Sequence, residues 1–286
     1  KCASSSVQNL LLRFGHERNL TFALPMNGNN LGGDRSPFHR SMLEGTPWNR
    51  PGTKYDIFGL HTKWNYDEVS AVLKDRPVFI SIVRDPVEMF KSLWDYVHIG
   101  NYYDGISLEE YALSEKTGRL ADRSRVRAYG GNQMLWDFGL DVDDLSNRTA
   151  INAKIAEIDK TFHLIMVSER FEESMILLRD LLCWDYRDVT SLVLNARKTE
   201  AKSALSKEAE AALREWLWAD YMLYDHFVEK FDAHVKAFGE DRMRQQIDII
   251  RHANANLQER CVDERVDSNL LPQKFKLLNP GVLGYK

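Results

Sequence analysis

The most constraining feature of the sequence is a buried-strand pattern that is followed at once by the start of a helix. Residues 77–83, Pro-Val-Phe-Ile-Ser-Ile-Val, are rich in β-branched side chains and show no alternation of apolar and polar positions. Such a run is typical of a strand buried on both faces of a parallel sheet. Arg84-Asp85-Pro86 follows, and a proline before apolar residues at helical spacing indicates a first helical turn. The pattern predicts a strand–turn–helix unit.

The rest of the chain continues this mixture of helices and strands. Residues 4–18 carry an amphipathic helical stripe, and residues 162–167 form a second apolar strand pattern. Further expected elements are a short strand over 21–25, a long loop over 26–54, and helices over 65–74, 108–136, 172–182, 206–238 (one helix or a pair) and 240–260. We therefore predict one α/β domain over residues 1–286, in which helices flank a P-loop-like central parallel sheet and a helical C-terminal part closes over it.

Composition excludes several classes of protein. The chain has 38 basic and 42 acidic residues, and its net charge of −4 argues against a nucleic-acid binder with a general positive field. Its three cysteines, Cys2, Cys183 and Cys261, are too few for a disulfide scaffold and lack metal-ligand spacing. The sequence leaves open whether Cys183 and Cys261 form a disulfide. Any anion site in this chain has to be local.

Two further features bear on the cellular compartment. No run reaches the roughly 18–20 apolar residues that a membrane span needs. The chain passes directly into a helical pattern, so we expect a strand and an anchor or targeting segment before residue 1. The tripeptides Asn19-Leu-Thr21 and Asn147-Arg-Thr149 are acceptor sequons for N-glycosylation, which fit a lumenal protein but also arise by chance.

One candidate anion site lies at the start of the first helix. Lys1 precedes Ala3-Ser4-Ser5-Ser6, so that one ammonium group, several hydroxyls and the amides of a helix N-terminus occur together. This combination can hold a phosphate, although the spacing of an ATP-binding P-loop is absent. The alternative is a serine that caps the helix beside an exposed lysine.

A second candidate anion site follows the buried strand. Arg84 stands at the carboxyl end of the strand, where ligands of parallel sheets bind, and Ser92 comes about two turns into the next helix. A phosphate or a carboxylate would suit this position. The alternative is an ion pair of Arg84 with Asp85 or Glu88.

The two sites together resemble a known family. Lys1-Cys-Ala-Ser-Ser-Ser6 resembles the 5′-phosphosulfate loop of membrane-bound Golgi carbohydrate sulfotransferases, and Ile82-Val-Arg84-Asp-Pro86 with Ser92 resembles their 3′-phosphate motif. The chain is most similar to the galactose-3-O-sulfotransferases, over residues 1 to about 235. Supporting stretches are 7–14, 19–25, Trp136-Asp-Phe-Gly-Leu-Asp141 and 162–174. Cys2 departs from the family, whose members commonly have threonine there, a change that a loop built on backbone amides should tolerate.

The resemblance implies a co-substrate and a mode of binding it. The sulfuryl donor would be 3′-phosphoadenylyl sulfate (PAPS), and no metal would be required because Lys1 stabilises the leaving group. Arg84 and Ser92 would hold the 3′-phosphate, and a late basic turn, Arg197-Lys198, would close over the nucleotide unless it is only solvated. The residues expected at the phosphosulfate are Lys1, Cys2, Ala3, Ser4, Ser5 and Ser6.

An acceptor hydroxyl needs a base, for which we select His61. It ends the apolar run 57–60 just before the strand that leads to Arg84, and related uronosyl sulfotransferases use a similar histidine. The alternative is a hydrogen-bonded structural histidine. Lys63, Trp64 and Trp48 are the expected acceptor contacts, although the tryptophans could equally be core residues. A basic stretch at Arg123, Arg125 and Arg127, with Asn132 and Gln133, could line the acceptor cleft or form a solvated face.

The resemblance also implies a biological setting. The acceptor would be a galactose-terminated glycolipid or glycan, and the protein would be a single-pass type II Golgi membrane protein with a lumenal catalytic domain. Competing interpretations are a sulfotransferase for a uronic acid of a glycosaminoglycan, an ATP-dependent kinase-like enzyme, and a non-catalytic glycan-binding relative. A uronic acid polymer would call for a dense basic cleft, against which the near-neutral net charge argues mildly. A kinase-like enzyme would need a Walker motif, which is absent, and a non-catalytic relative would fit the loss of Lys1 or His61, both of which are present. The aromatic helix over 206–238 would support a homodimer contact or simply pack in the core.

Overall fold

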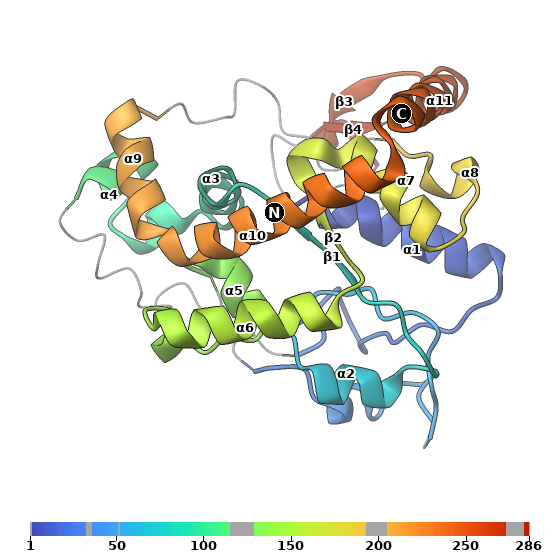
Figure 1. Ribbon diagram of the computed structural model, residues 1–286, viewed down its shortest axis with the longest axis horizontal. Coiled ribbons are helices and arrows are strands. Elements are labelled where there is room, and N and C mark those ends of the chain that lie inside the picture. Colours follow the sequence, from blue (N-terminus) through green and yellow to red (C-terminus); the bar gives the residue numbers. More distant parts are fainter. Residues whose placement is uncertain are drawn as a thin grey trace.

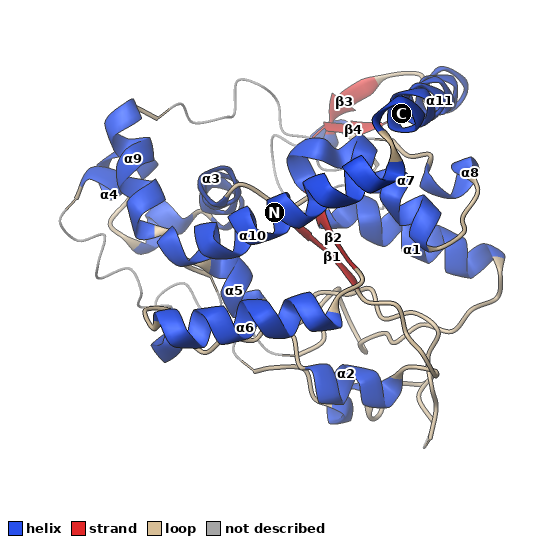
Figure 2. Cartoon of the chain, in the orientation of Figure 1, coloured by secondary structure: helices blue, strands red, loops and turns tan. Residues whose placement is uncertain are grey.

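The computed structural model describes residues 2–32, 36–50, 52–114, 129–192, 205–272 and 283–285. Within these ranges the fold is mixed α/β and mostly helical, with a small parallel sheet at its centre (Figure 2). The prediction of an α/β fold is confirmed in this form. The sheet consists of two hydrogen-bonded strands, so a larger P-loop-like sheet stays a prediction, as does the single domain over residues 1–286.

The two central strands are those that the sequence patterns predicted. β1 (Ile80–Val83) pairs in parallel with β2 (Leu164–Val167), with Ile80 opposite Leu164 and Val83 opposite Val167. All four β2 residues are buried, as a continuous apolar run predicts. The β1–β2 ladder begins at Ile80, three residues later than the predicted start at residue 77. Just before it, the His163 amide bonds the Phe79 carbonyl.

A helix follows each strand directly. α3 (Pro86–Val97) begins with a proline, and the Asp85 carboxylate caps it by accepting the Glu88 amide at 3.0 Å. The short 3₁₀ turn η5 (Ser168–Arg170) and α7 (Phe171–Leu181) follow β2. The buried Ser174 hydroxyl bonds both the amide and the carbonyl of Val167, which ties α7 to the strand end.

The C-terminal helices close over the sheet, as predicted, and the 206–238 pattern is a helix pair. α9 (Lys207–Trp216) leads into α10 (Trp218–Phe238), which crosses in front of β1 and β2 (Figure 1). α10 contacts β2 and packs against α3, α5, α6 and α7. Leu223, Phe227 and Phe231 supply its buried face within the main hydrophobic core.

One buried carboxylate joins α10 to the short helix α5 (Gln133–Asp137). Asp220 is fully buried, and its two carboxylate oxygens accept the amides of Met134 and Leu135 at 3.0 and 2.9 Å. The Asn132 side chain in turn accepts the Asp220 amide at 3.0 Å. A single helix over 108–136 is therefore wrong, because α4 (Leu108–Leu113) ends well before α5 begins, with residues 115–128 outside the described ranges.

A second, smaller hydrophobic cluster packs beneath the sheet in Figure 1, around α2 (Tyr66–Val72) and the 3₁₀ turn η1 (Arg40–Leu43). Isolated parallel bridges hold its extended segments, at Phe22–Ile57, Asn30–His61, Pro37–Lys63 and Tyr55–Leu73. The strand predicted over 21–25 is reduced to one such bridge. Phe162 contacts both clusters and so connects this part to the main core.

The remaining elements lie around these two clusters. They are α1 (Ser4–Glu17), η2 (Ile99–Tyr102), η4 (Val142–Asp144), α6 (Arg148–Thr161), α8 (Tyr186–Val189), α11 (Glu240–Cys261), β3 (Arg265–Asp267), η7 (Ser268–Leu270) and β4 (Leu283–Tyr285). The sequence analysis missed α6, whose N-cap is the sequon residue Asn147. All three cysteines are free thiols, so Cys183 and Cys261 form no disulfide. No helix in the described ranges combines the length and the apolar character that crossing a membrane would require.

We predict that Asp220→Ala strongly destabilises the protein. The change leaves two buried amides at the start of α5 without their acceptor, which should lower the free energy of unfolding by about 2–4 kcal/mol. Urea unfolding followed by circular dichroism measures this. Asp225→Ala on the exposed side of the same helix is the control and should stay within about 0.5 kcal/mol of the unchanged protein. Equal stabilities of the two variants would contradict the role of Asp220.

A second prediction concerns Asp56, which ties three extended segments together. Burial opposes its ionisation, but hydrogen bonds from Lys74 and Thr21 outweigh burial and lower the pKa of Asp56 from 3.8 to about 2. Because the folded-state pKa lies below the ordinary value, the stabilisation is complete above about pH 4 and is lost as the pH falls through 2. We expect Asp56→Asn to cost about 1–2 kcal/mol at pH 6 and almost nothing at pH 2.

Chemical denaturation at several pH values tests this dependence. Asp75→Asn changes the exposed residue that follows Lys74 and is the matched control. A cost of Asp56→Asn that does not change between pH 6 and pH 2 would contradict the assignment.

Candidate functional site

The candidate site lies at the carboxyl edge of the β1–β2 pair. Arg84 follows β1, and Glu169 follows β2 by two residues. The Arg84 guanidinium lies 3.6 Å from Glu88 and 3.9 Å from Glu169, and the Glu169 carboxylate also accepts the Asp85 amide at 3.0 Å. Of the two ion pairs considered for Arg84, the one with Glu88 is therefore formed, whereas Asp85 caps helix α3.

Two tyrosines of α10 extend over this edge. The Tyr221 hydroxyl donates to Asp85 at 3.0 Å, and the Tyr224 hydroxyl donates to Glu169 at 3.5 Å. Burial, with added repulsion from these carboxylates, raises the pKa of both tyrosines. Both hydroxyls consequently stay protonated donors at neutral pH. They hold the acidic side chains around Arg84 in a defined arrangement.

The start of α1 has the geometry of an anion-binding turn. Ala3 lies in the left-handed region with φ of 59°, and helical residues follow it directly. A left-handed residue beside a right-handed one turns successive amides towards one concave face, and the first amides of a helix have no acceptor inside that helix. The Ser6 and Val7 amides bond back to the Ala3 carbonyl, which fixes the turn. Ser4 and Ser5 are half-buried and Ser6 is buried.

The environment of Cys2 relates the two predicted anion sites to each other. Cys2 is buried in the same core as Val83 and Met134. Burial raises the pKa of the Cys2 thiol, while nearby Arg84 lowers it and Asp137 and Asp220 raise it further. The loop at the start of α1 therefore lies within electrostatic reach of Arg84. Ser92 is buried on α3, two turns beyond the strand end.

His61 lies on an extended segment beside α1. Its amide bonds the Asn29 carbonyl at 3.2 Å and its carbonyl accepts the Leu31 amide at 2.8 Å, while its side chain is exposed. The segment runs antiparallel to α1: Ile57 packs near Gly15, and the Gly59 carbonyl accepts from Gln8 at 2.9 Å. Gly59, two residues before His61, therefore lies beside Gln8 in the first half of α1.

The acceptor residues that the sequence predicted are in three different environments. Lys63 is buried, with its ammonium 2.9 Å from Asp141 and 5.1 Å from the centre of the Trp136 ring. Trp64 packs against Phe79 and Phe162, as a core residue would. Trp48 is exposed, and its indole N–H donates to the Leu24 carbonyl at 2.9 Å, which holds the ring in place.

Several predicted site residues lie outside the described residues: Lys1, Arg123, Arg125, Arg127, Arg197 and Lys198. Asn132 and Gln133 are described, and both are buried at the start of α5. The Gln133 side chain accepts the Gly130 amide and donates to Asp137 at 2.9 Å. These hydrogen bonds stabilise the turn that leads into α5. Within the described ranges no three His, Cys, Asp or Glu side chains form a group that could hold a metal ion.

Sequence reasoning missed Glu169, Tyr221, Tyr224 and Asp141. A carboxylate two residues after a buried strand was an available signal for Glu169, because strand ends meet at the ligand-binding edge. Tyr221 and Tyr224 were visible only as part of an apolar stripe. Asp141 had no signal, since its partner Lys63 is 78 residues away.

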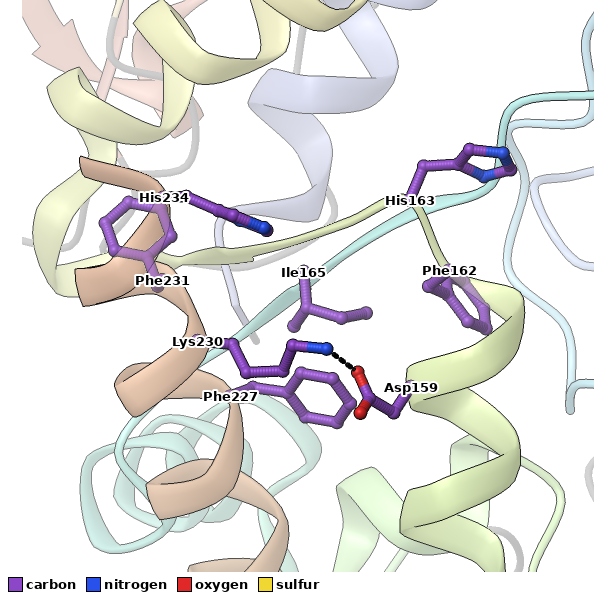
Figure 3. Close-up of a pocket in the computed structure, with 8 residues that line it drawn as sticks. All are labelled: Asp159, Phe162, His163, Ile165, Phe227, Lys230, Phe231 and His234. Carbon is purple, nitrogen blue, oxygen red and sulfur yellow. Dashed lines mark hydrogen bonds and ion pairs between the residues drawn. The ribbon is translucent and has the colours of Figure 1, made fainter. Parts of the chain in front are cut away.

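A cavity of about 70 Å³ lies elsewhere, near the amino end of β2 (Figure 3). Phe162, Ile165, Phe227 and Phe231 form its apolar walls, and the Lys230–Asp159 ion pair lies at its side. The His163 side chain points away from it. This cavity contains none of the predicted site residues.

Comparison with known proteins adds an independent finding. The sequence profile of the family described as Galactose-3-O-sulfotransferase matches residues 1–276. Galactosylceramide sulfotransferase of Homo sapiens is 34% identical over 269 residues, which cover 92% of this chain and 62% of that protein. Galactose-3-O-sulfotransferase 2 of Sus scrofa is 31% identical over 272 residues, covering 94% of this chain and 68% of that protein. Galactose-3-O-sulfotransferase 3 of Homo sapiens is 31% identical over 272 residues, covering 91% of this chain and 61% of that protein.

Proposed function

The chain belongs to the galactose-3-O-sulfotransferase family, and on this basis we propose that it transfers a sulfuryl group from PAPS to the 3-hydroxyl of a terminal β-galactose. It spans 62% of the length of the first curated relative that it matches, so the activity is proposed for the protein of which this chain is part. The proposal is supported by two anion-binding features, the turn at the start of α1 and Arg84 after β1, whose charge influences Cys2 in the α1 turn. PAPS carries a 5′-phosphosulfate and a 3′-phosphate, so its binding needs two such anion sites.

The α1 turn is suited to the phosphosulfate end of the donor. The left-handed Ala3 and the first amides of α1 form a concave donor surface, to which Ser4, Ser5 and Ser6 add hydroxyls. Lys1 would stabilise the charge that grows on the oxygen bridging to the 5′-phosphate, and in this way the leaving group departs without a metal. Arg84 with Ser92, and the later Arg197 and Lys198, would hold the 3′-phosphate and the nucleotide.

The acceptor would approach from the His61 side. Sulfuryl transfer resembles phosphoryl transfer in needing an in-line nucleophile and little covalent help from the protein. The exposed His61 imidazole would take the proton of the acceptor hydroxyl as the new S–O bond forms and the S–O bond to the 5′-phosphate breaks. The exposed, anchored Trp48 ring would offer an apolar surface to the sugar. Trp64 is less suited to contact a sugar, because its ring packs against Phe79 and Phe162.

The setting of this reaction is also part of the proposal. Glycolipid and glycan galactosides are the acceptors expected from the names of the relatives, such as galactosylceramide sulfotransferase. We propose a Golgi membrane protein of type II topology with this domain in the lumen, on the resemblance to Golgi carbohydrate sulfotransferases. Two sequons, at Asn19 and Asn147, are exposed and support a lumenal domain.

We predict that His61→Ala and Lys1→Ala both abolish transfer. Loss of a general base or of leaving-group stabilisation should lower kcat by about 10²–10⁴-fold. The measurement uses radiolabelled PAPS and a panel of terminal β-galactosides, with His16→Ala on the exposed surface of α1 as the control. Full activity of His61→Ala would rule out His61 as the base.

A separate prediction concerns nucleotide binding at Arg84. Arg84→Ala should weaken binding of adenosine 3′,5′-bisphosphate by about 10–100-fold, because a charge-assisted contact to the 3′-phosphate is lost. Glu169→Gln should strengthen it by about 3–10-fold, because a carboxylate 3.9 Å from Arg84 no longer competes with the phosphate. Titration calorimetry measures both, with Arg244→Ala on exposed α11 as the control.

Adenosine 5′-monophosphate, which lacks the 3′-phosphate, provides the second arm of this experiment. It should bind Arg84→Ala and the unchanged protein equally. A loss of affinity for both nucleotides in Arg84→Ala would contradict the assignment of Arg84 to the 3′-phosphate.

A further inference from the structure

The Lys63–Asp141 ion pair has an unusual orientation. The Lys63 side chain is only 4% exposed, whereas the Asp141 side chain is 76% exposed. The ammonium is thus turned inward over the Trp136 ring, and the carboxylate is presented to solvent. Since Lys63 is buried and bonds Asp141, it is poorly suited to contact a sugar itself.

Asp141, by contrast, is an exposed carboxylate held in one orientation. Its Oδ1 accepts from Lys63 at 2.9 Å, and its backbone precedes the 3₁₀ turn η4. The neighbouring turn is fixed to the His61-bearing segment, because the Trp64 amide bonds the Asp137 carbonyl at 2.8 Å. Gly139 packs so closely on the Trp64 carbonyl that an added Cβ would come within 2.5 Å of its oxygen. A carboxylate held in this way loses little side-chain entropy when it binds a ligand.

Asp141 meets the extended segment at Lys63, two residues beyond His61. His61 and Lys63 each form an isolated parallel bridge, with Asn30 and Pro37, and an extended chain between them would put their side chains on one face about 7 Å apart. Lys63 brings the Asp141 carboxylate onto that face. The Lys63 pairing therefore places an exposed carboxylate within two residues of the exposed His61.

We propose that Asp141 binds the acceptor sugar and that Lys63 is the positioning residue that holds it. Sugar hydroxyls are donors, and an ionised carboxylate is the strongest acceptor for them that a side chain offers. Hydroxyls adjacent to the reacting one would donate to Asp141 while His61 faces the reacting hydroxyl. The negative charge also selects against acceptors that carry a carboxylate, and so favours neutral galactose over a uronic acid. This inference rests on the proposed function.

Steady-state kinetics with PAPS and a methyl β-galactoside tests the proposal. Asp141→Asn should raise the KM for the galactoside by about 10-fold, the equivalent of one charge-assisted hydrogen bond, and leave the KM for PAPS within about twofold. Lys63→Met should raise the galactoside KM in the same way, and Lys63→Arg should restore most of it. Asp143→Asn, an exposed acidic residue in the same turn, is the control with unchanged kinetics. The rate with a β-glucuronide relative to the galactoside should increase in Asp141→Asn.

A double variant separates binding from folding. Removing Asp141 alone leaves a buried ammonium without its partner and could unfold the region. Lys63→Met/Asp141→Asn removes both charges, so it should fold and still show the raised galactoside KM. An unchanged galactoside KM in this double variant, with PAPS turnover intact, would overturn the role of Asp141 and leave the proposed function standing. If the unchanged protein binds adenosine 3′,5′-bisphosphate but sulfates no galactoside, the proposed function fails, and this inference fails with it.

Discussion

The buried carboxylate of Asp220 is the interaction on which the rest of the site depends. It caps α5 by accepting the amides of Met134 and Leu135, and it sits on α10, the helix that crosses the sheet. α5 and the turn after it then hold the His61-bearing segment through the Asp137 carbonyl and the Asp141 carboxylate. Burying a charge is costly unless every oxygen finds a donor, and here two helix-terminal amides meet that need.

The candidate site combines backbone amide donors with one arginine in a chain that is acidic overall. Backbone amides at the start of α1 carry no net charge, yet they present donors in a fixed arrangement. Arg84 is the charged element, and the carboxylates of Glu88 and Glu169 lie within 4 Å of its guanidinium. Tyr221 and Tyr224 keep the surrounding carboxylates in place by hydrogen bonding. These bonds fix the surroundings of Arg84, so an anion could bind there although the whole protein surface is not basic.

Sequence patterns predicted the parts whose signal is local. β1, α1 and α3 followed from a β-branched run, an amphipathic stripe and a proline at a first turn. α6 was missed because its buried residues, Ile151, Ile155 and Ile158, stand in an otherwise polar segment and give a weak stripe. The single helix over 108–136 was wrong because α5 begins where Asp220, 86 residues away from Met134, supplies its cap. No window of local sequence contains that information.

The sequence by itself determined the chemistry available: a serine-rich helix start, an arginine at a strand end and a histidine after a short apolar run, in an order that identifies the family. Tertiary structure alone decided how these groups are used. It put Cys2 of the α1 turn within electrostatic reach of Arg84, and it left His61 exposed while burying Lys63 two residues later. The physical reason is that exposure and charge pairing depend on which distant element covers a residue. Here Trp136 of α5 and Asp141 after it contact Lys63, whereas His61 is exposed.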